Sequence, residues 1–306
     1  MLKDKVRTES YRDFILGNPK LFKDKVVLDV GCGTGILSMF AAKAGARHVI
    51  AIDQSEIIYQ AMDIVRENSL EKIVTLLKGK AEEITLPVER VDIIISEWMG
   101  YFLLFESMLD TVLFARDKWL APGGVVFPDK CSIHVVAMGT LEKQPPKLNF
   151  WDDVYGFKMS CMKSSVSKEP CIAVVDHNAI ISTSSCIKRL DVNKCKTEDL
   201  NFISSFKLEM KRSDKLTAIV AYFDMVFEEN AEKKVEFSTS PAHPSTHWKQ
   251  TVFYLEKPID VTKAQIISGH ISCYKNLKEP RSLDIRIELV DKESEEILYD
   301  QEYLLQ

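Results

Sequence analysis

Short runs of β-branched and apolar residues alternate with longer amphipathic stretches over the first part of the chain. This alternation is typical of βαβ units, and it predicts a parallel sheet. We expect strands at 26–30, 48–52, 73–77, 91–96 and 125–127. The stretches between them predict helices at 35–44, 55–68 and 104–119. A further amphipathic helix is expected at about 3–16, ending at Gly17-Asn18-Pro19.

The pattern changes after Pro128, where runs of alternating polar and apolar residues replace the helical stretches. Such alternation is typical of antiparallel strands in a sandwich or barrel. The clearest runs lie at 132–137, 216–227, 252–255, 265–273 and 282–289. The sequence therefore predicts an α/β domain over 1–128 and a β-barrel domain over 129–306, in line with a length of 306 residues.

A polar and aromatic insert at about 140–170 interrupts the barrel pattern. Its large apolar residues are Trp151, Tyr155, Phe157, Met159 and Met162. Two interpretations stay open at this stage. The insert is either a loop packed on its own domain or an arm that docks on another subunit.

Composition excludes several classes of protein. A formal charge of -5 provides no basic field for nucleic acid, although an acidic cleft would attract a cationic partner. Seven scattered cysteines without a C-x-x-C pair argue against a disulfide framework and a zinc finger. The charged first residues and the lack of a long apolar run predict neither a signal peptide nor a membrane anchor, so we expect a reducing, cytoplasmic location.

The segment VVLDVGCGTG at 26–35 connects a predicted strand to a predicted helix through Gly31, Gly33 and Gly35. Glycines there let the backbone approach a ligand and leave helix N-terminal N–H groups free. A dinucleotide fingerprint would need glycine where this chain has Ile36, which argues against a nicotinamide-dependent dehydrogenase. Asp53 ends the second strand, where it can accept both hydroxyls of a ribose, cap the next helix, or do both.

Two carboxylates flank the apolar segment that follows the fourth predicted strand, SEWMGYFLLFESM at 96–108. Ligands of open α/β sheets bind at the carboxyl ends of the strands, so Glu97 is well placed, and the loop can bring Glu106 back beside it. Two unpaired carboxylates are costly to bury, and a planar guanidinium satisfies both better than an ammonium does. A structural alternative makes Glu97 a salt-bridge partner and Glu106 a helix N-terminal acid. Glycosidase chemistry is not favoured, because nothing nearby resembles a sugar site.

The barrel half contains Thr246-His247-Trp248. His243 lies four residues before His247, as two zinc ligands on one helix would. Pro244 and the lack of a helical pattern oppose that arrangement, so we expect no metal.

Together these motifs resemble the type I protein arginine N-methyltransferases. The glycine segment resembles motif I of class I S-adenosylmethionine-dependent methyltransferases, 97–108 resembles the double-glutamate loop of the family, and 246–248 resembles its THW loop. The resemblance implies a Rossmann-like parallel-sheet domain followed by an antiparallel β-barrel domain with a helical dimerisation arm. It extends from LKDKVRT at 2–8 through FPD at 127–129 to the end of the chain.

Within the family, VIAIDQSE at 49–56 and KNLKEPRSL at 275–283 resemble the subgroup of arginine methyltransferase 3. Family members usually carry an aromatic-rich helix ahead of LKDKVRT that closes over the cofactor. We therefore expect this sequence to begin inside the catalytic core, with weakened cofactor affinity.

The resemblance also implies a role for each matching residue. S-adenosylmethionine is the implied cofactor and S-adenosylhomocysteine its product, with Arg7 on the cofactor carboxylate, Asp53 on the ribose and Glu82 on the adenine amino group. The full implied cofactor set is Arg7, Asp29, Gly31, Gly33, Gly35, Asp53 and Glu82. The implied catalytic set is Glu97, Glu106, His247 and Asp4, in which His247 pairs with Asp4. The implied acceptor pocket contains Met1, Tyr101, Met108 and Trp248.

The implied reaction is direct displacement, in which a guanidinium nitrogen held by Glu97 and Glu106 attacks the methyl carbon in line with the departing sulfur. Its products are ω-monomethyl and asymmetric ω-dimethyl arginine in arginine- and glycine-rich proteins, including RNA-binding proteins. A homodimer through the 140–170 arm is implied, and the nucleus is a second expected compartment. The alternatives are a methyltransferase with another acceptor, such as lysine or a small molecule, and a catalytically silent assembly partner.

Overall fold

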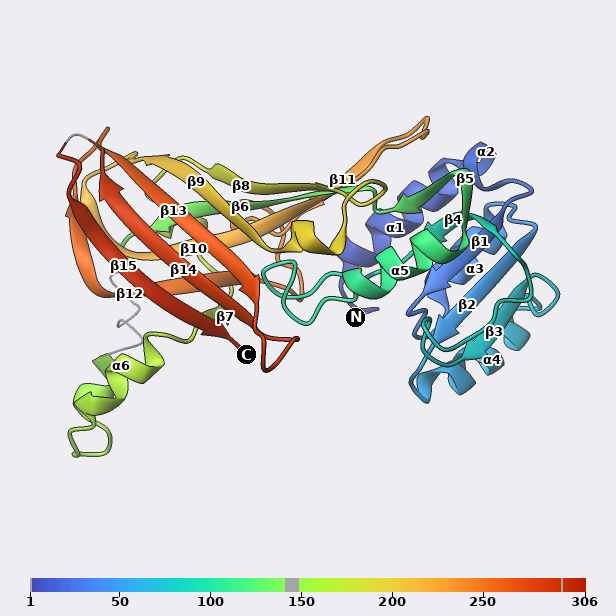
Figure 1. Cartoon of the computed structure of the whole chain (residues 1–306), viewed down its shortest axis with the longest axis horizontal. Coiled ribbons are helices and arrows are strands. Elements are labelled where there is room, and N and C mark those ends of the chain that lie inside the picture. The colour runs from blue at the N-terminus through green and yellow to red at the C-terminus, as the bar shows by residue number, and fades with distance from the viewer. Residues whose placement is uncertain (1, 141–148, 293) are drawn as a thin grey trace.

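The computed structural model describes residues 2–140, 149–292 and 294–306. A parallel sheet with its helices forms one end of the molecule and a β-barrel the other (Figure 1). Helix α1 (Lys5–Gly17) lies where the two meet, near the labelled N-terminus. Asp4 caps this helix by accepting from the backbone N–H of Arg7 at 3.1 Å.

The parallel sheet has five strands in the order β3-β2-β1-β4-β5. They are β1 (Val26–Val30), β2 (His48–Asp53), β3 (Val74–Lys78), β4 (Val91–Ile95) and β5 (Leu120–Phe127). The helices are α2 (Pro19–Phe22), α3 (Ile36–Lys43), α4 (Ile57–Glu67) and α5 (Leu109–Trp119). All residues of β1 are buried, which explains its continuous apolar run. The strand order reverses between β1 and β4, where ligands of such sheets bind.

The barrel combines two antiparallel sheets. The first has the order β7-β12-β10-β6-β8, with β11 paired to β10, and the second has the order β15-β14-β13-β9. The first sheet contains β6 (Lys130–Met138), β7 (Cys171–Ala173), β8 (Ser185–Asp191), β10 (Asp214–Phe227), β11 (Val235–Ser238) and β12 (Gln250–Val261). The second contains β9 (Phe202–Glu209), β13 (Ile266–Lys275), β14 (Leu283–Asp291) and β15 (Ile297–Leu305).

Helix α1 packs into both halves of the molecule. The Phe14 ring lies 4.6 Å from that of Phe127 in β5 and 5.0 Å from that of Phe227 in β10. At the helix end, Asn18 donates to the carbonyl of Lys233 and accepts from its N–H, both at 2.8 Å. One apolar core therefore runs through both halves.

The predicted parallel-sheet strands and the clearest barrel strands are confirmed, but the helix expected at 104–119 begins only at Leu109. Before it, Phe102, Leu103 and Glu106 have φ angles of 50°, 65° and 53°, in the left-handed region that a helix does not use. A Cβ on Gly100 would lie 1.7 Å from the carbonyl oxygen of Phe105, because the loop folds tightly back on itself. The apolar run is thus a buried turn.

The described part of the 140–170 insert, residues 149–170, projects from the barrel around α6 (Figure 1). It contains η1 (Asn149–Asp152), η2 (Ser160–Met162) and α6 (Lys163–Val166). Tyr155 and Phe157 are 95% and 69% exposed. Residues 141–148 lie outside the described residues. In the described ranges, no helix is both long enough and apolar enough to cross a lipid bilayer.

Candidate active site

A cavity of about 570 Å³ lies at the carboxyl ends of β1, β2 and β3. Gly31, Asp53 and Glu82 line it, together with Met108 from the loop that follows β4. Small-molecule sites have volumes of roughly 300–1,000 Å³. The cavity thus has the size and the position of a cofactor site, and it contains three of the predicted cofactor residues.

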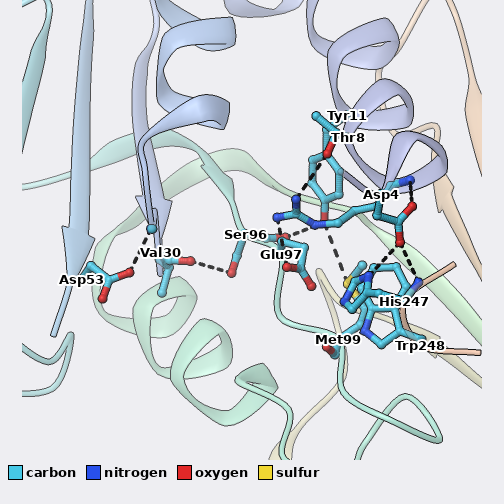
Figure 2. A network of polar contacts seen from close by, with 12 residues as sticks. Asp4, Thr8, Tyr11, Val30, Asp53, Ser96, Glu97, Met99, His247 and Trp248 are labelled. Atoms are coloured by element: carbon cyan, nitrogen blue, oxygen red, sulfur yellow. Dashed lines mark hydrogen bonds and ion pairs between the residues drawn. The ribbon is translucent and has the colours of Figure 1, made fainter. Parts of the chain in front are cut away.

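The glycine loop under this cavity has the backbone that its sequence requires. Gly31, Gly33 and Gly35 have φ angles of 73°, 54° and 79°, where other residues are strained. A Cβ on Gly31 would lie 2.3 Å from Cε of Met108, so only glycine fits this close approach. Gly33 and Gly35 do not line the cavity, and Gly33 instead donates its N–H to Asp53 at 2.9 Å (Figure 2).

Asp53 uses both of its carboxylate oxygens. Oδ2 accepts from Gly33, while Oδ1 accepts from the N–H and the hydroxyl of Ser55 at 2.8 and 2.6 Å. Asp53 thus lines the cavity and closes a turn with Ser55, but it does not cap α4, whose N-cap residue is Glu56 with no side-chain hydrogen bond. Glu82 accepts from the hydroxyl of Thr111 on α5 at 2.9 Å.

Asp29 does not take the place expected of it. Its side chain is fully buried and accepts from the hydroxyl of Ser38 on α3 at 2.6 Å. Burial raises the pKa of Asp29 to about 7. The Asp29 side chain therefore turns into the interface with α3 and does not line the cavity, and its role at the cofactor stays a prediction.

Glu97 forms an ion pair with Arg7 of α1 at 3.0 Å, and both residues are buried, with exposed fractions of 8% and 6% (Figure 2). Burial raises the pKa of Glu97 to about 7, although the charge of Arg7 lowers it in part. Arg7 does not itself line the cavity. Its buried Nε has no hydrogen-bond partner among the described residues. One donor of this buried guanidinium is thus unsatisfied.

His247 and Asp4 are joined as expected. Asp4 accepts from the ring Nδ1 of His247 at 2.7 Å and from its backbone N–H at 2.8 Å (Figure 2). Burial alone would raise the pKa of Asp4, but hydrogen bonds from His247 and Arg7 lower it below its usual value. Burial lowers the pKa of His247, and the bond to Asp4 opposes this in part. His247 is therefore neutral at pH 7, with Nδ1–H directed at Asp4 and Nε2 able to accept a proton.

Trp248 is a buried anchor and does not form an open pocket wall. Its indole N–H donates to the carbonyl of Met99 at 3.0 Å (Figure 2). Its ring stacks on that of Phe237, with the ring centroids 5.8 Å apart. The indole fastens the loop after β4 to the barrel, and the predicted contact of Trp248 with the acceptor stays a prediction. Tyr101, which is partly exposed, stacks with Phe105 at 6.4 Å. Met1 lies outside the described residues.

Glu106 lies on the same loop as Glu97 but has its own partner. Its carboxylate pairs with Arg281 of the barrel at 3.0 Å, and its backbone N–H donates to the Arg281 carbonyl at 3.3 Å. The loop closes through a bond of 2.8 Å from the N–H of Met108 to the carbonyl of Trp98. The loop thus folds back on itself and gives each glutamate a different arginine of this chain, while the approach of Glu106 to Glu97 stays a prediction.

Sequence reasoning did not identify Tyr11, Ser96 or Arg281. The Tyr11 hydroxyl donates to the carbonyl of Ser96 at 2.8 Å, and the Ser96 hydroxyl donates to that of Val30 at 2.7 Å (Figure 2). This chain of bonds connects α1 to the cavity edge. Ser96 and Arg281 lie in motifs described above, but nothing local indicates their contacts, since their partners lie far away in sequence. In the described parts of the chain, no group of His, Cys, Asp and Glu residues is arranged to hold a metal ion.

Two family models match the chain. The arginine methyltransferase oligomerization subdomain matches residues 129–294, and a methyltransferase domain matches residues 27–124. Protein arginine N-methyltransferase 1 of Chlamydomonas reinhardtii is 52% identical over 287 residues, which cover 94% of this chain and 83% of the relative. The protein of the same name from Schizosaccharomyces pombe is 53% identical, with coverage of 94% and 84%.

Solved structures agree with these sequence matches. A Trypanosoma brucei PRMT1 enzyme–prozyme heterotetrameric complex with AdoHcy superposes with a TM-score of 0.95 at 44% identity, covering 100% of this chain and 96% of that one. Arabidopsis thaliana protein arginine methyltransferase 10 gives a TM-score of 0.88 at 28% identity, with the same coverage. The predicted fold class and enzyme class are confirmed, whereas the resemblance to subgroup 3 stays a prediction, because these curated relatives are named arginine methyltransferase 1. The chain belongs to the protein arginine N-methyltransferase family.

Proposed function

We propose that this chain transfers methyl groups from S-adenosylmethionine to arginine guanidinium nitrogens in proteins, giving ω-monomethyl and asymmetric ω-dimethyl arginine. One observation carries the proposal. Met108 packs against Gly31 in the cofactor-sized cavity and belongs to the same loop as Glu97 and Glu106. A cofactor in the cavity and a cation on this loop would therefore be neighbours.

The residues around the cavity fit S-adenosylmethionine. Asp53 and Glu82 provide carboxylates for the hydroxyls and the amino group of an adenosine, and the unpartnered Nε of Arg7 provides a donor for an amino-acid carboxylate. Gly31 lets the side chain of Met108 pack against the backbone at the cavity wall. When bound, the cofactor supplies an electrophilic methyl group and leaves as S-adenosylhomocysteine.

Glu97 and Glu106 hold the acceptor guanidinium in this proposal. Arginine is protonated, with a pKa above about 12, so its nitrogens are poor nucleophiles until charge is drawn onto one of them. Unequal hydrogen bonding to a buried carboxylate and to an exposed one does this. Orientation of the reactants contributes about 7–11 kcal/mol to such reactions.

His247 is the group that we assign to receive the proton. Its Nδ1–H is held by Asp4, so Nε2 carries the free lone pair. A pKa below the usual histidine value keeps the ring neutral and ready to accept. Asp4 then stabilises the imidazolium that forms.

Mass spectrometry of a glycine- and arginine-rich peptide, incubated with the protein and S-adenosylmethionine, tests this function. We expect mass increases of one and then two methyl groups, and fragmentation that identifies asymmetric dimethylarginine. The same peptide with lysine at every arginine is the control and should stay unmodified. Modification of the lysine peptide, or none of the arginine peptide, would contradict the proposal.

We further propose a homodimer through the 140–170 insert. Its exposed Tyr155 and Phe157 support this, since aromatic side chains are enriched at protein interfaces. Of the two interpretations of the insert, an arm is thus favoured over a packed loop.

We also propose a subgroup, a class of substrates and a cellular location for this chain. Motifs at 49–56 and 275–283 support a catalytic core like that of arginine methyltransferase 3. Arginine- and glycine-rich proteins, including RNA-binding proteins, suit a cation-binding loop better than nucleic acid or a membrane does. All seven cysteines are free thiols, which supports the cytoplasm, with the nucleus as a second location.

A further inference from the structure

The turn between β13 and β14, residues 276–282, lies against the loop that contains Glu106. Arg281 from this turn pairs through Nη2 with Oε1 of Glu106 at 3.0 Å. Beside it, the Lys275 ammonium pairs with the carboxylate of Asp110, in the first turn of α5. The barrel thus places two cations on the carboxylates that flank Met108.

The two glutamates differ in how firmly their arginines are held. Arg7 and Glu97 are both buried, and separating such a pair would leave an uncompensated charge. The side chains of Glu106 and Arg281 are 45% and 77% exposed, and they share a single N···O contact. Exposed pairs of this kind contribute little to stability, because solvent screens the two charges. The inner pair is therefore costly to separate, and the outer pair can exchange.

The group on Glu106 has the same chemistry as the proposed substrate. We propose that Arg281 is an internal competitor for the acceptor site, whose guanidinium occupies Glu106 until the guanidinium of a substrate arginine displaces it. This inference rests on the proposed function. Arg281 would then set the affinity of the enzyme for its acceptor without taking part in methyl transfer.

Steady-state kinetics of Arg281→Met with a glycine- and arginine-rich peptide test this assignment. Methionine keeps much of the side-chain length and removes the cation. We expect KM for the peptide to fall by about two- to five-fold, the range that an exposed pair allows, with kcat within about two-fold of wild type. Arg281→Lys keeps the charge and should give an intermediate KM.

Arg286→Met is the matched control. Arg286 lies on β14, is also exposed, and forms its ion pair with Asp300 at 2.6 Å. The charge change is the same, but Arg286 pairs with Asp300 and not with Glu106, so KM should not change. Calorimetric titration of the peptide into each variant with S-adenosylhomocysteine gives a readout that does not depend on turnover, and it should show the same ratios.

An unchanged or raised KM in Arg281→Met would overturn the inference, as would a large fall in kcat at constant KM, which would show that Arg281 orients Glu106. An equal fall in KM in Arg286→Met would also overturn it, because the loss of any exposed positive charge would then explain the effect. If the wild-type protein methylates the peptide and Arg281→Met has the wild-type KM, the proposed function stands and only the competition by Arg281 is refuted. A wild-type protein that forms no methylarginine refutes the proposed function and this inference with it.

Discussion

The ionisation state of Glu97 should determine whether the site can bind the acceptor guanidinium. Burial raises the pKa of this carboxyl to about 7, and only the ionised form attracts a guanidinium. The ionised fraction grows as the pH rises through about 7. Below this pH the protonated acid no longer attracts the acceptor, so activity should fall as the pH decreases.

The pH dependence of kcat/KM checks this, because that ratio reports ionisations of the free enzyme. Between about pH 5.5 and 9, we expect an acidic limb with an apparent pKa near 7. The limb should persist in His247→Gln, since the pKa of His247 lies below its usual value. A flat profile across this range would contradict this prediction. An acidic limb that is lost in His247→Gln would show that His247, and not Glu97, is the group that ionises.

The close approach of Gly31 to Met108 should limit which residues this position tolerates. Gly31→Ala puts a Cβ at φ 73°, 2.3 Å from Cε of Met108 on the cavity wall. Backbone strain of this kind costs about 1–3 kcal/mol, and Met108 must also move. We expect a lower melting temperature and at least about ten-fold weaker S-adenosylmethionine binding by calorimetry.

Gly123→Ala is the control for strain alone. Gly123 has φ 78°, and its Cβ would meet nothing within 4 Å. Gly123→Ala should lower the melting temperature by about as much as Gly31→Ala does, and it should leave cofactor binding unchanged. Equal cofactor affinity in the two variants would show that the approach of Met108 to Gly31 does not shape the site.

The sequence predicted residues whose role is local and missed those whose role depends on distant partners. Gly31 and Asp53 follow directly from a strand-to-helix motif. Nothing near Arg281 in the sequence shows that it reaches Glu106, because tertiary packing creates that contact. Asp29 belongs to the same motif as Gly31, yet its direction depends on packing against α3.

At the scale of elements, the loop after β4 shows why an apolar run can mislead. Residues 101–105 are apolar and precede a true helix, so they continue its pattern. In the structure they turn back, and the Phe102 ring packs against that of Phe253 in β12 at 5.6 Å. A turn that is buried between two domains has apolar residues at every position, so its sequence shows no strand or helix period. Strands such as β8 and β15 were missed because their polar residues obscure the alternation.

The exposed aromatic residues of the 140–170 insert should stabilise the proposed homodimer. Replacing Tyr155 and Phe157 together by serine removes exposed aromatic area, so the dimer should dissociate at least about ten-fold more readily. Light scattering coupled to size-exclusion chromatography measures this. Ile203→Ser, an equally apolar and exposed change on β9, should leave the mass unchanged. A double variant that keeps the wild-type mass would place the interface elsewhere.

At the scale of the whole molecule, the candidate site exists only where the two halves meet. The parallel-sheet half supplies Glu97, the barrel supplies His247, and the segment that begins α1 supplies Asp4 and Arg7 to contact them. The two-domain organisation could be predicted because the hydrophobic period changes near Pro128. How the halves pack could not, since aromatic contacts of Phe14 and Phe227 determine it.

The central claim is that Glu97 acts on the acceptor and not on the cofactor. Glu97→Gln keeps the shape of the side chain and removes its charge, and Glu9→Gln on the exposed side of α1 is the control. Calorimetry with S-adenosylmethionine and turnover on the arginine peptide are measured on the same preparations. We predict that Glu97→Gln binds the cofactor within about two-fold of wild type and turns over at least about 100-fold more slowly, while Glu9→Gln matches wild type in both. Turnover near the wild-type rate in Glu97→Gln, or loss of cofactor binding together with turnover, would contradict the account.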